Sequence, residues 1–447
     1  HREMGLNTLR VWGGGLAERD GFYNAADKLG MLVMQELWMT GDNNGRWAGE
    51  YSWPDDHHLY LRAVEDTVLR LRSHASLLFL CGGNELHPKG KNPSGDVAAG
   101  IHRIVTSLDP TRFYIESSMA PQEANASAWL ASYALAMQDG PYGPLLVPDY
   151  WQWQPGLNSD YQAAAIRIPF QPEVGSSSQP VLRSLRRFLS NASLQAFPRK
   201  GALEGAALHR SFRNESWVFH KYLTFATFNS SSISPANSSY DHVYAYGEHE
   251  NIEDFCFAAQ MVQRQQYQAL YEGFLSRMWS ARTAVFMWKS QSPWPALRGA
   301  LYDYYLAPTG GYYGVKRALQ ETTHVQLRWD IHRDHRKPQW GVDIVSRLPH
   351  RLSNLSLSVE WLSIQGASVL RQRLPVQNVM PNAATQAGIA LQWPTELDTT
   401  NATRGSNANG SPPLLLRLML RSSAGILLSH NEQLLSGQNP AAPDYSA

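Results

Sequence analysis

The stretch LLFLCGGNE, residues 77–85, gives the clearest indication of the architecture of this chain. Five apolar residues in a row, Leu77–Cys81, predict a short strand that is buried on both faces, which is typical of a parallel sheet. Two glycines end this strand, and Asn84 and Glu85 follow them directly. Side chains at the carboxyl ends of parallel strands are the ones that reach a ligand, so this stretch predicts both a buried strand and two candidate site residues.

The same alternation of strand and helix continues from residue 1 to about residue 320. We expect strands at 7–12, 31–36, 77–81, 113–116, near 143–148, at 166–170 leading into QPEVG, and at 284–288. We expect helices at 20–29, 55–73, 95–108 and 251–280. Seven buried strands are explained best by an α/β fold, an eight-stranded (β/α)8 TIM barrel whose first strand is missing from this chain because it precedes His1.

Beyond about residue 320 the pattern changes to separate strand-length segments with turns rich in Gly, Pro, Asn and Ser. The segments are 325–329, 341–345, 355–359 and 414–420. They predict an Ig-like β-sandwich over residues 321–447, which follows an N-terminally truncated barrel domain over residues 1–320.

Composition excludes several classes of protein. The 447 residues carry 39 Lys+Arg against 38 Asp+Glu, so the net charge of +1 gives no electrostatic case for nucleic acid or for an anionic membrane surface. No apolar run approaches the ~18 residues that a membrane span needs. Two cysteines, with neither a CxxC nor an HExxH motif, predict no metal site, and we expect no organic cofactor either. The 15 Trp, 20 Tyr and 14 Phe suit a neutral, hydroxylated ring as ligand.

Two glutamates stand out as candidates for chemistry. Glu85 and Glu173 each come after an apolar strand and lie near a glycine. A pair of carboxyls that converge in one pocket is typical of glycoside hydrolases. One carboxyl donates a proton to the leaving oxygen, and the other attacks the anomeric carbon. The residues alone leave open that each glutamate ends its strand by pairing with a nearby arginine. Asn84 favours the first interpretation, because it adds a ligand for a sugar hydroxyl beside Glu85.

Five segments together resemble glycoside hydrolase family 2. They are NTLRVWGGG (7–15), GMLVMQELWMTGD (30–42), LFLCGGNELHP (78–88), FQPEVGS (170–176) and VFMWKSQSPWPALRG (285–299). The resemblance covers roughly residues 1–327, and the C-terminal part matches only as a generic β-sandwich. It implies an enzyme whose barrel carries two catalytic glutamates.

By this resemblance Glu85 is the general acid/base and Glu173 is the nucleophile. Arg10 resembles the arginine of the family that holds the nucleophile ionised and oriented, although an ordinary ion pair is the alternative. Asn84 resembles the residue that contacts the substituent at C2 of the sugar.

The remaining candidates are substrate-binding residues. Trp288, at the end of the last strand, is placed by the resemblance at the floor of the site for the cleaved sugar. Trp12 is either an aromatic wall or a packing residue. Glu36, which ends a strand, has either a substrate-hydroxyl role or a structural role, and is not expected to be a third catalytic carboxyl.

The resemblance therefore implies a retaining enzyme that cleaves β-mannosidic bonds, such as Manβ1-4GlcNAc in the cores of N-glycans. Its substrate would be an oligosaccharide or glycopeptide, with no nucleic acid, no membrane insertion and no cofactor. The alternatives are an exo-acting β-mannosidase or exo-β-glucosaminidase of the same family, and a non-catalytic glycan-binding protein. Eight N-x-S/T sequons favour a secretory or vacuolar route, although loops rich in Asn and Ser also create sequons by chance.

Overall fold

The structure is a computed structural model that describes residues 1–41, 51–86, 92–118, 137, 147–152, 169–175, 178–197, 239–280, 282–297, 300–330, 339–394 and 412–436. It divides into two compact units. The first unit comprises residues 1–140, 154–174 and 283–287, and the second unit comprises residues 141–153, 175–282 and 288–447.

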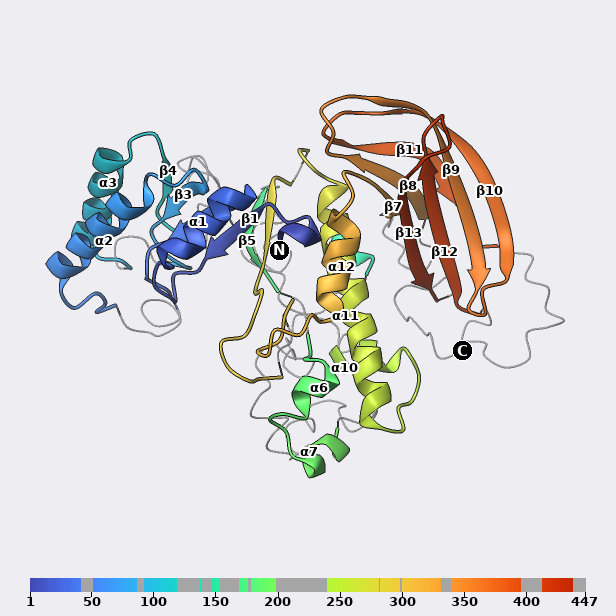
Figure 1. The fold of residues 1–447 in the computed structure, drawn as a ribbon, viewed down its shortest axis with the longest axis horizontal. Helices are drawn as coiled ribbons and strands as arrows, with labels where there is room; N and C mark the ends of the chain where they lie inside the picture. The colour runs from blue at the N-terminus through green and yellow to red at the C-terminus, as the bar shows by residue number, and fades with distance from the viewer. Residues whose placement is uncertain are drawn as a thin grey trace, which may run out of the picture. The chain divides into compact units, whose positions relative to one another are not determined.

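The first unit is built from parallel strands and the helices that connect them (Figure 1). Its strands are β1 (Thr8–Val11), β2 (Leu32–Glu36), β3 (Leu77–Cys81), β4 (Phe113–Ile115), β5 (Phe170–Val174) and β6 (Ala284–Met287). Its helices are η1 (Arg2–Met4), α1 (Asp20–Leu29), α2 (His57–Leu71) and α3 (Gly95–Leu108). Strands β1-β2-β3-β4 form one parallel sheet in that order, and β5 and β6 form a parallel pair. These strands and helices confirm the predicted alternation.

Two of the predicted strands need comment: one differs from the prediction, and the other lies mostly outside the described residues. Strand β5 begins at Phe170 and continues to Val174, so Glu173 lies inside the strand and does not follow it. The pairing of β5 with β6 is irregular between Gln171 and Val174, where Pro172 has no N–H to donate to a ladder. The strand expected near 143–148 lies mostly outside the described residues. Residues 147 and 148 are described, and they form a turn.

The strands of the first unit contribute buried residues to two apolar clusters, one on each face of the sheet. Leu80 and its neighbours on one face pack against helices α1, α2 and α3 in a single apolar cluster. On the other face Phe79 and Cys81 share a second cluster with Phe170 of β5 and Phe286 of β6. The ring centroids of Phe79 and Phe170 are 6.0 Å apart, and those of Phe170 and Phe286 are 5.5 Å apart. The four-stranded sheet and the β5–β6 pair therefore enclose a common core, and β1 is also in contact with β6.

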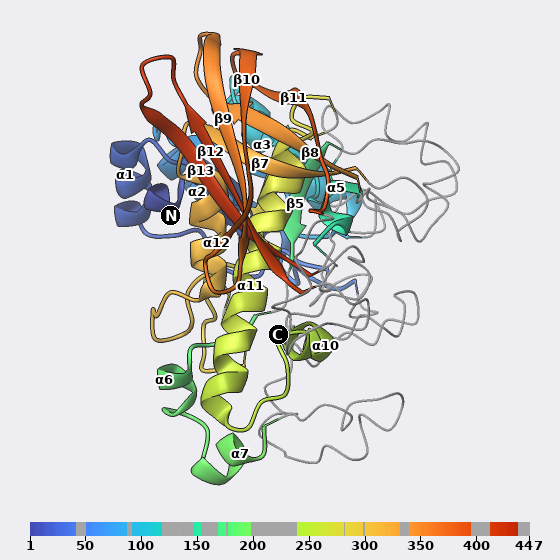
Figure 2. The same cartoon turned by 90° about the vertical axis from the view of Figure 1, so that its right-hand side faces the viewer.

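The second unit combines helices with two antiparallel sheets (Figure 2). Its helices are α5 (Asp149–Gln152), α6 (Leu182–Leu185), α7 (Asn191–Gln195), α10 (Ser239–Tyr244), α11 (Ile252–Leu275) and α12 (Gly310–Leu319). Its strands are β7 (Thr323–Asp330), β8 (Gln339–Ser346), β9 (Leu352–Ser363), β10 (Ser368–Val379), β11 (Ala383–Leu391), β12 (Leu414–Arg421) and β13 (Leu427–Leu435). The strand orders are β10-β9-β12-β13 and β11-β8-β7.

The two antiparallel sheets face each other across a core of tryptophans. Buried and partly exposed residues alternate along the whole of β12, as expected for a strand with one face on a core. Trp340 of the three-stranded sheet lies 6.1 Å, between ring centroids, from Trp361 of the four-stranded sheet. Trp393 packs on both of these rings. Antiparallel sheets beyond residue 320 are thus present, as the sequence predicted.

Within the ranges that the structure describes, no helix is long and apolar enough to span a lipid bilayer.

Candidate active site

The segments that follow β2, β3 and β4 remain side by side beyond the ends of the strands. The N–H of Asn84 donates to the carbonyl of Met39 at 2.9 Å, and the N–H of Ser118 donates to the carbonyl of Gly83 at 3.1 Å. Glycine is required here, because a Cβ on Gly83 would lie 2.6 Å from the Met39 oxygen and one on Gly13 would lie 2.3 Å from it. The carboxyl ends of three neighbouring strands are therefore held close together.

Arg10, on β1, connects the polar side chains at this end of the sheet. Its Nη1 donates to Oε2 of Glu173 at 2.9 Å and to the carbonyl of Pro172 at 2.7 Å. Its Nε and Nη2 donate to Oε1 of Glu36 at 3.1 and 2.8 Å, and Nη2 also donates to Oδ1 of Asn84 at 2.6 Å. The Arg10 side chain is only 6% exposed, so these bonds are charge-assisted and largely withdrawn from solvent. An opposite charge at this distance favours the ionised form of a carboxyl.

Glu36 is the most deeply buried acid of the group, with 0% of its surface exposed. Its Oε2 accepts the backbone N–H of Gly13 at 2.6 Å, while its Oε1 accepts from Arg10. Burial raises the pKa of Glu36, although the Arg10 charge and the Gly13 N–H act in the opposite direction. Both carboxylate oxygens of Glu36 are thus held by protein donors.

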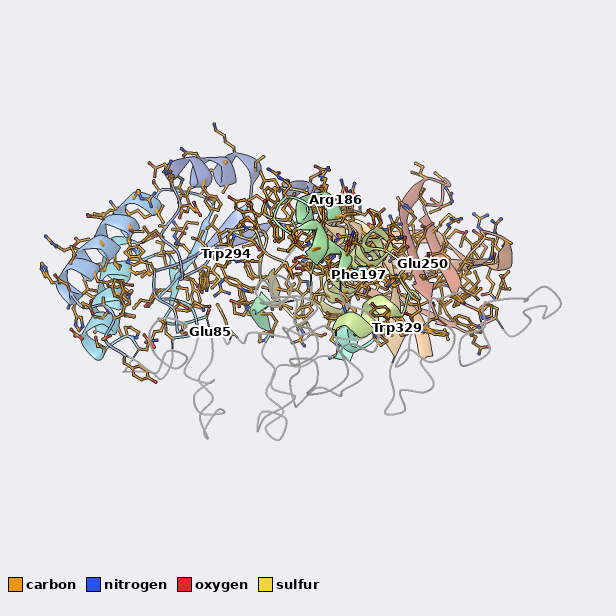
Figure 3. The ribbon with its side chains drawn as sticks, turned by 90° about the horizontal axis from the view of Figure 1, so that it is seen from below. Glu85, Arg186, Phe197, Glu250, Trp294 and Trp329 are labelled. Carbon is orange, nitrogen blue, oxygen red and sulfur yellow. The ribbon has the colours of Figure 1, made fainter. Side chains whose placement is uncertain are left out.

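Glu85 lies at the rim of the first unit, beyond β3, and is labelled in Figure 3. Its backbone has a φ of 51°, in the left-handed region that residues other than glycine rarely adopt. Its N–H donates to Oγ of Ser118 at 3.1 Å, and the same Oγ accepts from Nη2 of Arg10 at 3.3 Å. Because Nη1 of Arg10 binds Glu173, one hydroxyl and one guanidinium connect the backbone of Glu85 to the carboxylate of Glu173.

The two predicted tryptophans belong to different units. Trp12 follows β1 and is half-buried, and its indole lies so near Gly14 that a Cβ there would approach within 1.9 Å of the ring. Trp288 follows β6, is half-buried, and is part of the second unit, where Nζ of Lys289 lies 5.5 Å from its ring centroid. The structure therefore brings Arg10, Glu36, Asn84 and Glu173 together by direct bonds and places Glu85 beside them.

Two residues of this network were not predicted from the sequence. Ser118, after β4, contacts Arg10, Glu85 and Asn84, and Oγ1 of Thr40, after β2, accepts from Nδ2 of Asn84 at 3.1 Å. Both follow strands at the carboxyl end, and this position was the signal that could have identified them. In the described residues no group of three or more His, Cys, Asp or Glu side chains is arranged to hold a metal ion.

Comparison with known proteins gives three kinds of result. No protein-family model matches the chain. Over 390 residues, 82% of this chain and 37% of the relative, the chain is 33% identical to the mannosylglycoprotein endo-beta-mannosidase of Lilium longiflorum. Over 412 residues, 84% of this chain and 43% of the relative, it is 26% identical to beta-mannosidase B of Aspergillus niger. The chain thus spans less than half the length of these curated relatives.

Solved structures with the same fold include two glycosidases. The exo-chitosanase of Amycolatopsis orientalis has a TM-score of 0.70 at 21% identity, over 98% of this chain and 45% of its own. The beta-D-mannosidase of Dictyoglomus thermophilum has a TM-score of 0.64 at 18% identity, over 99% of this chain and 47% of its own.

These comparisons confirm the resemblance to glycoside hydrolase family 2, because the relatives to which the chain is similar are named glycosidases. Within the family, it is similar to the plant mannosylglycoprotein endo-beta-mannosidase.

Proposed function

We propose that this chain carries the catalytic centre of a retaining glycoside hydrolase that cleaves β-mannosidic bonds. The observation that carries this proposal is the position of Arg10, which binds the carboxylate of Glu173 directly and is connected to the backbone N–H of Glu85 through Ser118. This connection supports a common site for the two acids, because it joins the backbone that carries Glu85 to the guanidinium that binds Glu173. The names of the two mannosidase relatives support the choice of sugar.

The proposed reaction has two steps. The Glu173 carboxylate attacks the anomeric carbon while the Glu85 carboxyl donates its proton to the departing glycosidic oxygen, which leaves as an alcohol. The resulting glycosyl ester on Glu173 is then cleaved by water, whose proton returns to Glu85. A retaining enzyme of this kind holds the two carboxyls about 5–5.5 Å apart.

We assign supporting roles to the neighbouring residues. Arg10 keeps Glu173 ionised and oriented, and Glu36 holds Arg10. The amide of Asn84, fixed by Arg10 and Thr40, is proposed to contact the substituent at C2 of the sugar. Trp12 and Trp288 are proposed as apolar surfaces for the pyranose ring.

We further propose that the parallel strands of the first unit belong to a (β/α)8 barrel. The common core enclosed by the four-stranded sheet and the β5–β6 pair supports this closure, as does the contact of β1 with β6. In this proposal the barrel domain extends to residue 320 and the Ig-like sandwich comprises residues 321–447.

The preferred substrate is the Manβ1-4GlcNAc bond inside an N-glycan core, by similarity to the lily relative. The second candidate is an exo-acting β-mannosidase or exo-β-glucosaminidase, because the chain is also similar to enzymes with those names. Mass spectrometry of the products from a defined N-glycan glycopeptide distinguishes them. An endo enzyme releases an oligosaccharide, whereas an exo enzyme releases single mannose or glucosamine units.

The catalytic assignment is tested by Glu85→Ala and Glu173→Ala in the full-length protein. We expect the loss of Glu85 to lower kcat/KM by about 10²- to 10⁴-fold on a substrate with a poor leaving group, and azide to restore turnover of an activated aryl mannoside. The loss of Glu173 should abolish formation of the glycosyl ester. Glu253→Ala is the control, since Glu253 is half exposed on α11 and pairs with Arg186. Parent rates for either test variant would contradict the proposal.

A further inference from the structure

Two serines that follow β4 contact the backbone of the Glu85 segment. The N–H of Glu85 donates to Oγ of Ser118 at 3.1 Å, and the N–H of Leu86 donates to Oγ of Ser117 at 2.9 Å. The segment they hold is unusual, because Glu85 has a φ of 51° although it carries a side chain. A conformation of this kind persists only where its surroundings enforce it.

Ser118 is itself rigidly placed. It is 0% exposed, and its own N–H donates to the carbonyl of Gly83, two residues before Glu85. A hydroxyl has two lone pairs and one proton. Oγ of Ser118 makes three hydrogen bonds. It accepts from the N–H of Glu85 and from Nη2 of Arg10, and it donates to Oδ1 of Asn84 at 3.4 Å.

We propose that Ser117 and Ser118 are positioning residues that fix Glu85 as general acid by holding its backbone in the left-handed conformation. This inference rests on the proposed function of Glu85. Ser118 has the larger part, because it also connects the Glu85 backbone to the guanidinium that binds Glu173. The two serines thereby hold the backbone that carries the acid, and Ser118 connects it to the group that holds the nucleophile.

The consequence is a specific kinetic defect. A displacement of a catalytic group by about 1 Å can cost on the order of 10²-fold in rate. That cost falls on the step in which Glu85 protonates the leaving oxygen. An alkyl or oligosaccharide leaving group needs this proton, whereas a dinitrophenolate leaves without it.

The experiment compares Ser118→Ala and Ser117→Ala with the parent full-length protein on two substrates, dinitrophenyl β-mannoside and an unactivated β-mannosyl disaccharide. We expect Ser118→Ala to lower kcat/KM by about 10- to 100-fold on the disaccharide and by less than about threefold on the dinitrophenyl substrate. Ser117→Ala should show the same selectivity with a smaller loss, and it serves as the second variant if the buried Ser118 site does not tolerate alanine.

The matched control is Ser429→Ala in the sandwich. Ser429 is 1% exposed, and its Oγ accepts the N–H of Val325 at 2.9 Å, so the substitution removes a hydrogen bond of the same kind. It should lower stability and leave the ratio of the two rates unchanged.

Equal losses on both substrates, or parent rates on both for Ser117→Ala and Ser118→Ala, would overturn the positioning role. Glu85→Ala, measured in parallel, keeps the two proposals distinct. If it shows the leaving-group dependence while the serine variants do not, the positioning inference is wrong and the proposed function stands. If Glu85→Ala itself shows no such dependence, the proposed function fails.

Discussion

Arg10→Lys is the substitution that examines the network most directly, because it keeps the positive charge and removes the planar fork of donors. In the structure Nη1 reaches Glu173 at 2.9 Å while Nε and Nη2 reach Glu36 at 3.1 and 2.8 Å. One ammonium on a flexible stem cannot serve both carboxylates in this geometry. We expect it to stay with Glu36, which is fully buried and would otherwise be an uncompensated acid.

The magnitude follows from the bond that is lost. A hydrogen bond to a charged group contributes about 1.5–3 kcal/mol. If the bond to Glu173 is needed in the transition state, its loss corresponds to roughly a 10- to 150-fold decrease in kcat/KM, at about 1.4 kcal/mol per factor of ten. The carbonyl of Pro172 and the amide of Asn84 would also lose a donor, so the decrease belongs in the upper half of this range.

The assay is kcat/KM on dinitrophenyl β-mannoside, with the free energy of unfolding measured on the same samples. Arg328→Lys is the matched control, since Nη1 of Arg328 binds Oδ1 of Asp343 at 2.7 Å within the sandwich. It should lower the free energy of unfolding and leave kcat/KM unchanged. An unchanged kcat/KM for Arg10→Lys would show that the fork does not orient Glu173, and equal kinetic losses in both variants would point to general destabilisation.

Two further predictions concern stability. His324 of β7 is buried 2.9 Å from Glu272 and 3.7 Å from Glu321; burial opposes its protonation, but the two carboxylates outweigh this and raise its pKa. Its stabilising contribution is therefore complete below the ordinary pKa of about 6.5 and is lost as the pH rises through the raised value, so denaturant midpoints should fall over this range and His324→Gln should flatten the fall. Leu80→Ala removes a fully buried side chain and should cost about 2–5 kcal/mol, whereas Leu78→Ala on the same strand, where the side chain is 40% exposed, should cost under about 1 kcal/mol by the same urea titration.

Much of the first unit was predictable because its strands contain short runs of apolar residues. Strands β2 and β3 carry buried residues on both faces, so short apolar runs between helices were sufficient to locate them. Strand β10 was missed for the opposite reason: it reads SVLRQRLPVQNV, and its only buried positions are Val376 and Val379. It is a strand because it pairs with β9, the strand directly before it in the chain, and this pairing does not require apolar residues in β10. Helix α12 was also not predicted.

The site was predictable where chemistry and strand ends coincide. Asn84 and Glu85 follow the two glycines that end a strand, and Arg10 lies within the first strand, so their positions in the sequence are sufficient to mark them as candidates. Ser118 and Thr40 also follow strands, but this position alone did not distinguish them from the other hydroxyl residues at strand ends. Both residues belong to the network because the segments after β2, β3 and β4 lie side by side. This arrangement is visible only in the folded chain.

The arrangement around Glu36 favours one of the two roles that the sequence left open for it. A residue that binds a substrate hydroxyl must present at least one oxygen to the ligand. Oε1 of Glu36 accepts from two nitrogens of Arg10, Oε2 accepts from Gly13, and the side chain has no exposed surface. This geometry supports the structural role. Because Glu36 binds Nε and Nη2 on one edge of the guanidinium, it fixes the plane of the group and leaves Nη1 directed at Glu173, so a buried acid that never meets the sugar would still determine how the proposed nucleophile is held.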